Sequence, residues 1–243
     1  MSSDKHLDRL LKDWSYDPQS LSVRLVKGED GRDVIQMRID MGILQIETTG
    51  RPDGSRFDGF ETYLAYLLNC EADEPDFAMS EEQCFEADRE FAQYYHRRIS
   101  WLRLQHYQRA VQDADHTLEL MDVCRDHGPD EDWVMSHEQY RPFVLFHRTQ
   151  ALAFLALENE DAEEAVNAIN DGLQTLKDLF AEHEAEDLYD EDEMVQKLKQ
   201  FRESLRSEYE LGKTLPERLA DAVATEQYEL AARLRDEMAQ RKK

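Results

Sequence analysis

Apolar side chains recur at intervals of three and four residues through most of this chain from Ser80 onward. This spacing is the period of an α-helix that buries one face. The chain has only nine Gly and six Pro among 243 residues, so few residues are available to interrupt long helices. The pattern therefore predicts a mainly α-helical protein.

Residues 20–49 follow a different rule, because apolar and polar side chains alternate there. A period of two is typical of half-buried strands. Asp30 and Gly31 can form a hairpin turn between the first two apolar runs, and Met41 with Gly42 offers a second break. The alternating apolar residues are Leu21, Val23, Leu25, Ile35, Met37 and Ile39, followed by Ile43, Leu44 and Ile46. We predict a three-stranded antiparallel meander.

Three bare strands would be only marginally stable, so the meander needs a cover. An apolar run at 60–68 predicts a short helix on the sheet, which would make residues 1–78 a small α+β domain. Between sheet and helix lies "GRPDG" at 50–54, whose residue types are those that turns require. We favour a structural turn, and the alternative is a ligand loop with Arg51 and Asp53 as polar contacts.

Two stretches within the helical part are similar to each other in layout. "WLRLQHYQRAVQDA" and "AFLALENEDAEEAVNAINDGL" resemble the junction of tetratricopeptide repeats, with Leu104 and Ala110 in one and Leu157 and Ala165 in the other. The resemblance spans 80–182, although the two alanines are 55 residues apart and the usual terminal Pro is absent. It implies a bundle of repeat-like helical hairpins, which we place at 80–211. A packing role and a peptide-binding role both remain open for it.

Residues 181–193 contain eight carboxylates and no Lys or Arg. Such a run usually solvates a linker or a helix surface. The alternative is weak binding of a divalent cation, but the central Gly of the usual calcium loop is missing. We therefore predict no metal site.

The chain carries a formal net charge of -25 at pH 7. Affinity for nucleic acid comes largely from cations that displace condensed counterions, so direct DNA or RNA binding is disfavoured. No run of eighteen apolar residues occurs, and the N-terminal stretch carries charges where a secretory signal would be apolar. These observations predict a cytoplasmic protein that does not enter a membrane.

Motifs of catalysis and cofactor binding are absent from the sequence. It holds no phosphate loop of the G-x-x-x-x-G-K type, no H-E-x-x-H and no G-x-S-x-G. Cys70, Cys84 and Cys124 form no C-x-x-C pair, so we expect free thiols. Asp113 and His116 in "DADH" could lie close together on a helix, and we assign them a surface or packing role. We predict a non-enzymatic protein without cofactor; an enzyme with a site between meander and bundle is a further alternative.

The last stretch, "LPERLADAVATEQYELAARLRDEMAQRKK" at 215–243, divides into two short helices on a helical wheel. Apolar residues on the first occupy a narrow arc, whereas those on the second span roughly 200°. One antiparallel neighbour covers only part of so wide an arc, so an apolar strip should remain for a partner. Arg235 lies within this arc, and we expect it to form an ion pair across the interface.

The stretch 215–243, in which "YELAARLRDEM" is the most specific part, resembles the UVR motif. This motif is named for the UvrB and UvrC subunits of bacterial nucleotide excision repair and occurs also in adaptors of the Clp protease system. The resemblance implies a helical hairpin that mediates contact between proteins. The residues we expect to contact a partner are Leu219, Ala222, Val223, Tyr228, Ala231, Ala232, Leu234, Arg235 and Met238.

Together these features predict a bacterial-type cytosolic adaptor that docks a partner protein or a second copy of itself. The partner implied by the resemblance is a UVR-containing or Clp/Uvr-type protein, although the paired cysteines of the Clp adaptors are missing. The alternative function is an accessory factor of nucleotide excision repair, recruited through the same motif.

Overall fold

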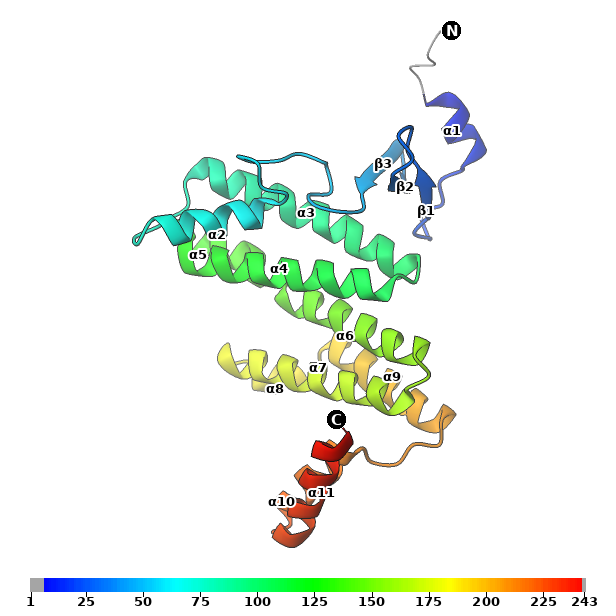
Figure 1. Cartoon of the computed structure of the whole chain (residues 1–243), viewed down its shortest axis with the longest axis vertical. Coiled ribbons are helices and arrows are strands. Elements are labelled where there is room, and N and C mark those ends of the chain that lie inside the picture. Colours follow the sequence, from blue (N-terminus) through cyan, green and yellow to red (C-terminus); the bar gives the residue numbers. More distant parts are fainter. Residues whose placement is uncertain (1–6, 242–243) are drawn as a thin grey trace. The chain divides into compact units, whose positions relative to one another are not determined.

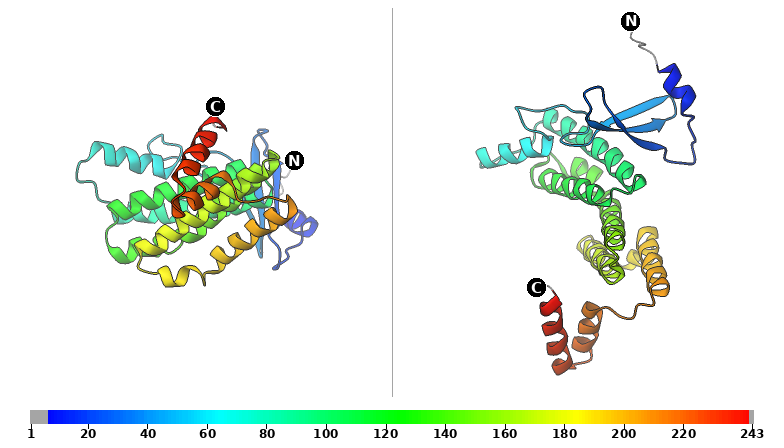
Figure 2. Two further views of the ribbon diagram at one scale, coloured as in Figure 1. Left: turned by 90° about the horizontal axis from the view of Figure 1, so that it is seen from below. Right: turned by 45° about the vertical axis from the view of Figure 1, so that its right-hand side comes forward.

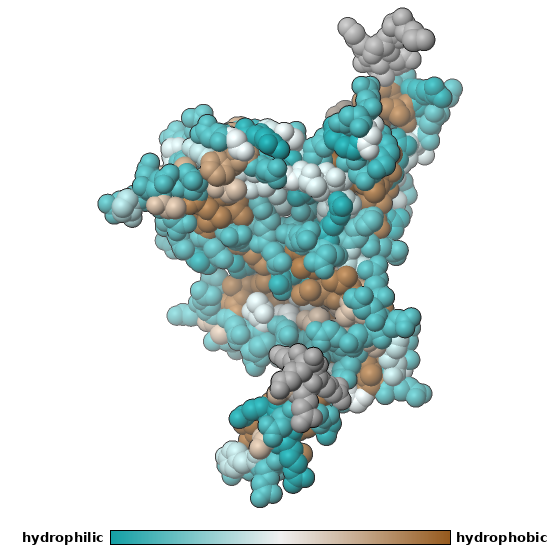
Figure 3. Space-filling view, viewed as in Figure 1, coloured by the Kyte–Doolittle hydropathy of each residue, from teal (hydrophilic) through white to brown (hydrophobic). Residues whose placement is uncertain are grey.

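A computed structural model describes the chain from Leu7 to Arg241. The protein is mainly α-helical with a small antiparallel sheet near the N-terminus, as predicted (Figure 1). It divides into two compact units, residues 1–148 and 149–243, and the division falls inside one long helix. The face drawn in Figure 3 is mostly hydrophilic, in keeping with the excess of acidic residues.

The predicted meander is confirmed. Strands β1 (Val23–Lys27), β2 (Asp33–Ile39) and β3 (Gly42–Glu47) pair antiparallel in that order. Ile35 of β2 lies opposite Leu25 on β1 and Ile46 on β3. The first turn closes where the N–H of Gly28 donates to the carbonyl of Arg32 over 2.8 Å, and Gly31 takes the positive φ that this turn requires.

Burial does not follow the alternation strictly. Val34 on β2 is buried together with its neighbour Ile35, whereas Leu25 in the middle of β1 and Ile39 at the end of β2 are exposed. Before the sheet, a short helix α1 (Asp8–Asp13) was not predicted, since its six residues are too few for a clear period.

Unit 1 continues with α2 (Tyr63–Asp73), α3 (Glu81–Arg103), α4 (Tyr107–His127) and α5 (Glu131–Glu138). Helix α3 begins with a capping box, because the N–H of Gln83 donates to Ser80 Oγ and the N–H of Ser80 donates to the Gln83 side chain. Ala110 on α4, one of the two alanines that carry the repeat resemblance, is buried where α3 and α4 form an antiparallel pair.

Helix α2 does not cover the sheet, so that prediction was wrong. It begins at Tyr63, three residues later than expected, and packs on α3 and α4 through a core that it shares with Ala87 and Leu120. The right-hand view of Figure 2 shows α2 away from the strands. Helix α3 is the element that contacts β2, because its 23 residues are long enough to reach both α2 and the sheet.

Helix α6 (Arg141–Glu158) contains the division between the units, and α7 (Ala162–Glu182), α8 (Glu186–Tyr189) and α9 (Glu193–Glu208) follow. Buried residues on α7 recur at helical spacing, and α7 packs against α9. They are Ala165, Val166, Ile169, Leu173 and Leu176. Unit 2 ends with α10 (Leu215–Ala224) and α11 (Tyr228–Arg241).

The acidic segment at 181–193 includes the end of α7, all of α8 and the start of α9. Asp192 accepts hydrogen bonds from the N–H groups of Met194 and Val195 and so caps α9. Asp190 pairs with Lys199 at 2.6 Å, and this pair lowers the pKa of Asp190. These contacts are those of a solvated helix surface, as predicted.

Candidate functional site

The C-terminal helices form a hairpin with a small core of its own. The turn is tight: Glu226 has a positive φ, and the N–H of Gln227 donates to the carbonyl of Ala222 over 2.7 Å. At the start of α10 the N–H of Thr214 donates to the Glu217 carboxylate over 2.8 Å, which satisfies a donor just before the first turn. The core consists of Leu215, Ala222, Ala231 and Leu234, with Leu219 and Met238 packed partly against it.

The structure separates the nine predicted contact residues into two groups. Those that face the other helix of the hairpin are Leu219, Ala222, Ala231, Leu234 and Met238. Those that are exposed are Val223, Tyr228, Ala232 and Arg235. The first group holds the hairpin together, and only the second is open to a partner.

The exposed group lies on one side of the hairpin. In two antiparallel helices, residues that directly follow the buried positions are turned by about 100° toward the same side. On α10, Val223 follows Ala222; on α11, exposed residues follow Ala231, Leu234 and Met238, and Tyr228 lies one turn before the first of them. We call this surface the outer face and define it as Val223, Tyr228, Ala232, Arg235 and Ala239.

The outer face is apolar apart from one cation. Val223 is 49% exposed and Tyr228 is 67% exposed, and the two alanines leave room for a close approach. The opposite side is charged, because Asp221, Arg233 and Glu237 precede the buried positions, although Leu230 is exposed there as well. Ala239 was not among the contact residues predicted from the sequence. Its position one helical turn after Arg235 is the feature that could have identified it.

The hairpin is also electrically neutral. Residues 215–243 hold six acidic and six basic side chains, so the whole excess of 25 negative charges lies in residues 1–214. This segment therefore lacks the net negative charge that the rest of the chain carries.

A second group of polar residues, which the sequence did not reveal, lies buried in unit 1. Its centre is Glu90, which is 0% exposed on α3. Its carboxylate accepts from the N–H groups of Tyr63 and Leu64 over 2.7 and 3.0 Å, and so caps the first turn of α2. His116 Nε2 lies 2.8 Å from Glu90 Oε1, and Arg51 Nε lies 3.2 Å from Glu90 Oε2. This buried polar network comprises Arg51, Glu86, Glu90, Tyr94, Arg97, Asp113 and His116.

The same network ties the end of the sheet to α3. Arg97 pairs with Asp113 at 2.8 Å and donates to the carbonyls of Glu47 and Gly50. Tyr94 stacks on the His116 ring at 3.7 Å between centroids, and burial raises the pKa of Tyr94. The network thus joins α3, α4 and the loop at 50–54.

The network's chemistry is that of a structural anchor. Each buried carboxylate in it is matched by an arginine, a histidine or backbone N–H groups, as buried charges require. Asp113 and His116 of "DADH" take different partners, which agrees with their predicted packing role. The sequence signal for the network is a set of charged residues, Glu90 and Arg97, inside the apolar stripe of α3.

The loop at 50–54 belongs to this anchor. Arg51 is buried and pairs with Glu86 at 2.8 Å, while Asp53 accepts from Ser55 and Gln93. Both side chains are thus used to fix the loop to α3, which supports the structural interpretation of "GRPDG" over a direct ligand role for these two residues.

Cys84 and Cys124 are buried free thiols, whereas Cys70 is half-buried. Burial raises the pKa of both buried thiols.

Between Leu7 and Arg241, no cluster of three His, Cys, Asp or Glu side chains is arranged to hold a metal ion. Within that range, no helix has the length and apolar character needed to cross a membrane.

Comparisons with protein-family models, with curated proteins and with solved structures found no match to this chain.

Proposed function

We propose that this chain is a non-enzymatic adaptor of the bacterial cytosol that docks another protein through the hairpin α10–α11. The observation that carries the proposal is the outer face. Its apolar side chains stay exposed after the hairpin has buried its own core, so they contribute nothing to folding while they face water. Burial of such side chains against a partner is favourable.

Two further features support docking at this place. The neutral hairpin avoids the repulsion that the rest of the acidic chain exerts on other acidic proteins. Arg235 stands among apolar residues, where a carboxylate on the partner can pair with it in a setting with less water. The occupant is a partner of the UVR or Clp/Uvr type, as the motif resemblance implies, or a second copy of the chain.

The test replaces the outer face and leaves the core of the hairpin intact. A Val223→Asp, Tyr228→Asp double variant should lose partners that wild-type protein captures from native extract, as read by affinity purification and mass spectrometry. The matched control is Leu230→Asp, an exposed leucine on the opposite side, which should keep them. Leu234 is unsuitable because it is buried, and an aspartate there would unfold the hairpin.

Light scattering of the purified chain decides between the two kinds of occupant. Self-docking requires a dimer that the double variant loses and the control keeps. If the double variant retains the same extract partners and the same mass in solution as wild type, the hairpin is not the docking site.

The second candidate function is an accessory role in nucleotide excision repair. It rests on the same resemblance and the same face, with an excision-repair subunit as the partner. A strain that lacks the protein should then be more sensitive to ultraviolet light, and unchanged survival would reject this role while leaving the adaptor proposal intact.

A further inference from the structure

The outer edge of strand β1 presents unpaired backbone groups. In an antiparallel pair, the N–H and C=O groups of successive residues point alternately toward the neighbouring strand and away from it. The carbonyl of Ser22 accepts from the N–H of Arg38 over 2.9 Å, so Ser22 and every second residue after it face β2. The residues between them point their backbone groups outward, and within β1 these are Val23, Leu25 and Lys27.

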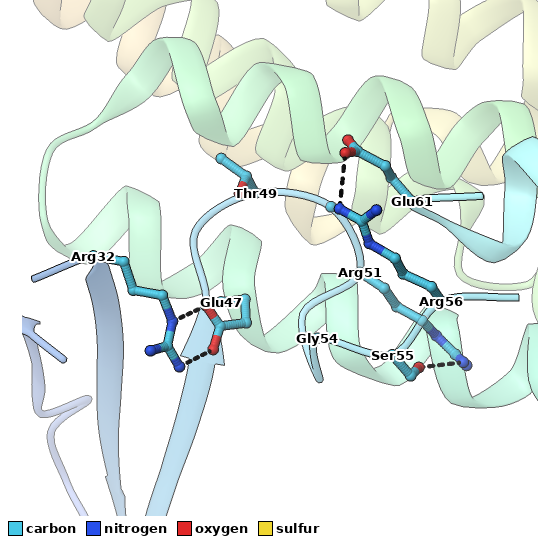
Figure 4. A pocket seen from close by; sticks show the side chains of 9 residues that line it. Arg32, Glu47, Thr49, Arg51, Gly54, Ser55, Arg56 and Glu61 are labelled. Atoms are coloured by element: carbon cyan, nitrogen blue, oxygen red, sulfur yellow. Dashed lines mark hydrogen bonds and ion pairs between the residues drawn. The ribbon is translucent and has the colours of Figure 1, made fainter. Parts of the chain in front are cut away.

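The two outer edges of the sheet differ in what covers them. Between Leu7 and Arg241, no strand lies beside the outer edge of β1, and no hydrogen bond reaches its outward backbone groups. On β3, the N–H of Glu47 donates to the carbonyl of Pro52 over 2.8 Å, and the Glu47 carbonyl accepts from Arg97. Figure 4 shows the Glu47 side chain paired with Arg32 at the same end of β3. The chain thus occupies part of one edge and leaves the other free.

The side chains of β1 are compatible with a further strand. Leu25, at the centre of β1, is 39% exposed, although its neighbour Ile35 on β2 is fully buried. An exposed leucine contributes to stability only when it leaves water. A lysine on an edge strand opposes pairing when its charge is free, but Lys27 pairs with Asp33 at 2.8 Å.

We propose that β1 pairs antiparallel with β1 of a second copy of this chain, across a two-fold axis at Leu25. The two three-stranded sheets then form one sheet, and the exposed Leu25 side chains cover each other. Val23 of each copy lies opposite Lys27 of the other, and Arg24 lies opposite Val26, so no like charges face each other directly. Each pair of outward residues can form two N–H···O bonds. This contact is separate from the hairpin and does not rest on its proposed function.

The sequence of β1 selects this register. Only an axis at Leu25 pairs all five residues of β1 with residues of β1. An axis at Arg24 or Lys27 would set two cations opposite each other, which is unfavourable. A shift toward the start of the strand would reach Leu21, whose carbonyl already accepts from Arg103 over 3.0 Å.

The first test is a disulfide across the axis. Hydrogen-bonded antiparallel pairs have Cα atoms about 5.5 Å apart, which suits a disulfide. Under mild oxidation, full-length Leu25→Cys should form a covalent dimer about tenfold or more faster than Met41→Cys, because pairing raises the effective concentration of the two thiols. Met41 is the control because it is 89% exposed but lies at the turn between β2 and β3. Equal rates would overturn the proposal.

The second test measures mass by light scattering at about 1 to 100 µM, because short strands bury little area and the dimer should dissociate on dilution. Leu25→Lys sets like charges opposite each other at the axis and should weaken the dimer about tenfold. It replaces an exposed side chain, so the fold should persist, as circular dichroism would show.

The Val223→Asp, Tyr228→Asp variant should keep this dimer, so loss of docking at the hairpin and loss of the β1 contact are distinguishable. A wild-type chain that is monomeric at about 100 µM would overturn the proposal and leave the edge to a strand of another protein. An unchanged dimer in Leu25→Lys would also overturn it.

Discussion

Glu90 illustrates how much one residue can organise. A carboxylate that is fully buried loses its hydration, and here two backbone N–H groups, an arginine and a histidine replace the lost water. The charge on Glu90 also faces the positive end of the α2 dipole. The contacts of Glu90 therefore join α3 to α2, α4 and the loop at 50–54.

We expect Glu90→Gln to lower the free energy of unfolding by about 3 kcal/mol, because it leaves Arg51 buried without one of its charged partners. Urea denaturation followed by circular dichroism measures this change. Glu82→Gln, at an exposed position on the same helix, should change stability by less than about 0.5 kcal/mol. Equal stability of the two variants would show that the network contributes little.

His147 predicts a pH effect at the same scale. Burial and the nearby Arg98 lower the pKa of His147 to about 4. Unfolding returns the ring to its ordinary pKa near 6.5, so the unfolded chain takes up a proton between pH 6.5 and 4 and stability falls across that window. Between pH 7 and 5 this loss should be about 2 kcal/mol.

The measurement compares urea denaturation of wild type and His147→Gln at pH 7 and pH 5. The variant lacks the ring, so its stability should fall by about 2 kcal/mol less than that of wild type over this interval. The same pH dependence in both proteins would place the effect on other groups.

At the scale of elements, helical periodicity was enough to locate most of α3, α4, α6, α7 and the hairpin, and alternation located the sheet. What the sequence could not provide was which elements meet. The apolar residues of α2 fit a sheet or a helix pair equally well, and the deciding contacts run from Glu90 to Tyr63, 27 residues apart.

Gly172 gives a test at this scale. A Cβ added there would overlap Thr149 Oγ1, so Gly172→Ala should destabilise the protein by about 1–2 kcal/mol although alanine is the better helix former. Thr149→Ala in the same chain should restore part of the loss, because it removes the two nearest atoms, Oγ1 and Cγ2, but keeps Cβ. Thermal unfolding measures both, with Gly212→Ala as the control because nothing lies within 4 Å of its added Cβ. A single Gly172→Ala variant as stable as wild type would contradict the close approach.

At the scale of the whole molecule, charge is distributed unevenly. The neutral hairpin follows 214 residues that hold all the excess negative charge. Self-repulsion of that kind keeps copies of a protein apart and soluble, at the cost of opposing any contact made through the acidic surface. A docking surface is best placed where the local charge is balanced, and the hairpin is such a place.

The cap that Glu90 places on α2 also has a consequence for the order in which the chain can fold. The first two N–H groups of α2 find their acceptor 26 and 27 residues later in the sequence. A nascent chain that has emerged only as far as α2 lacks that acceptor, and eleven residues are too few for a stable helix alone. Helix α3 must therefore be synthesised and packed before α2 can remain folded. Folding of the earlier segment thus depends on the later one.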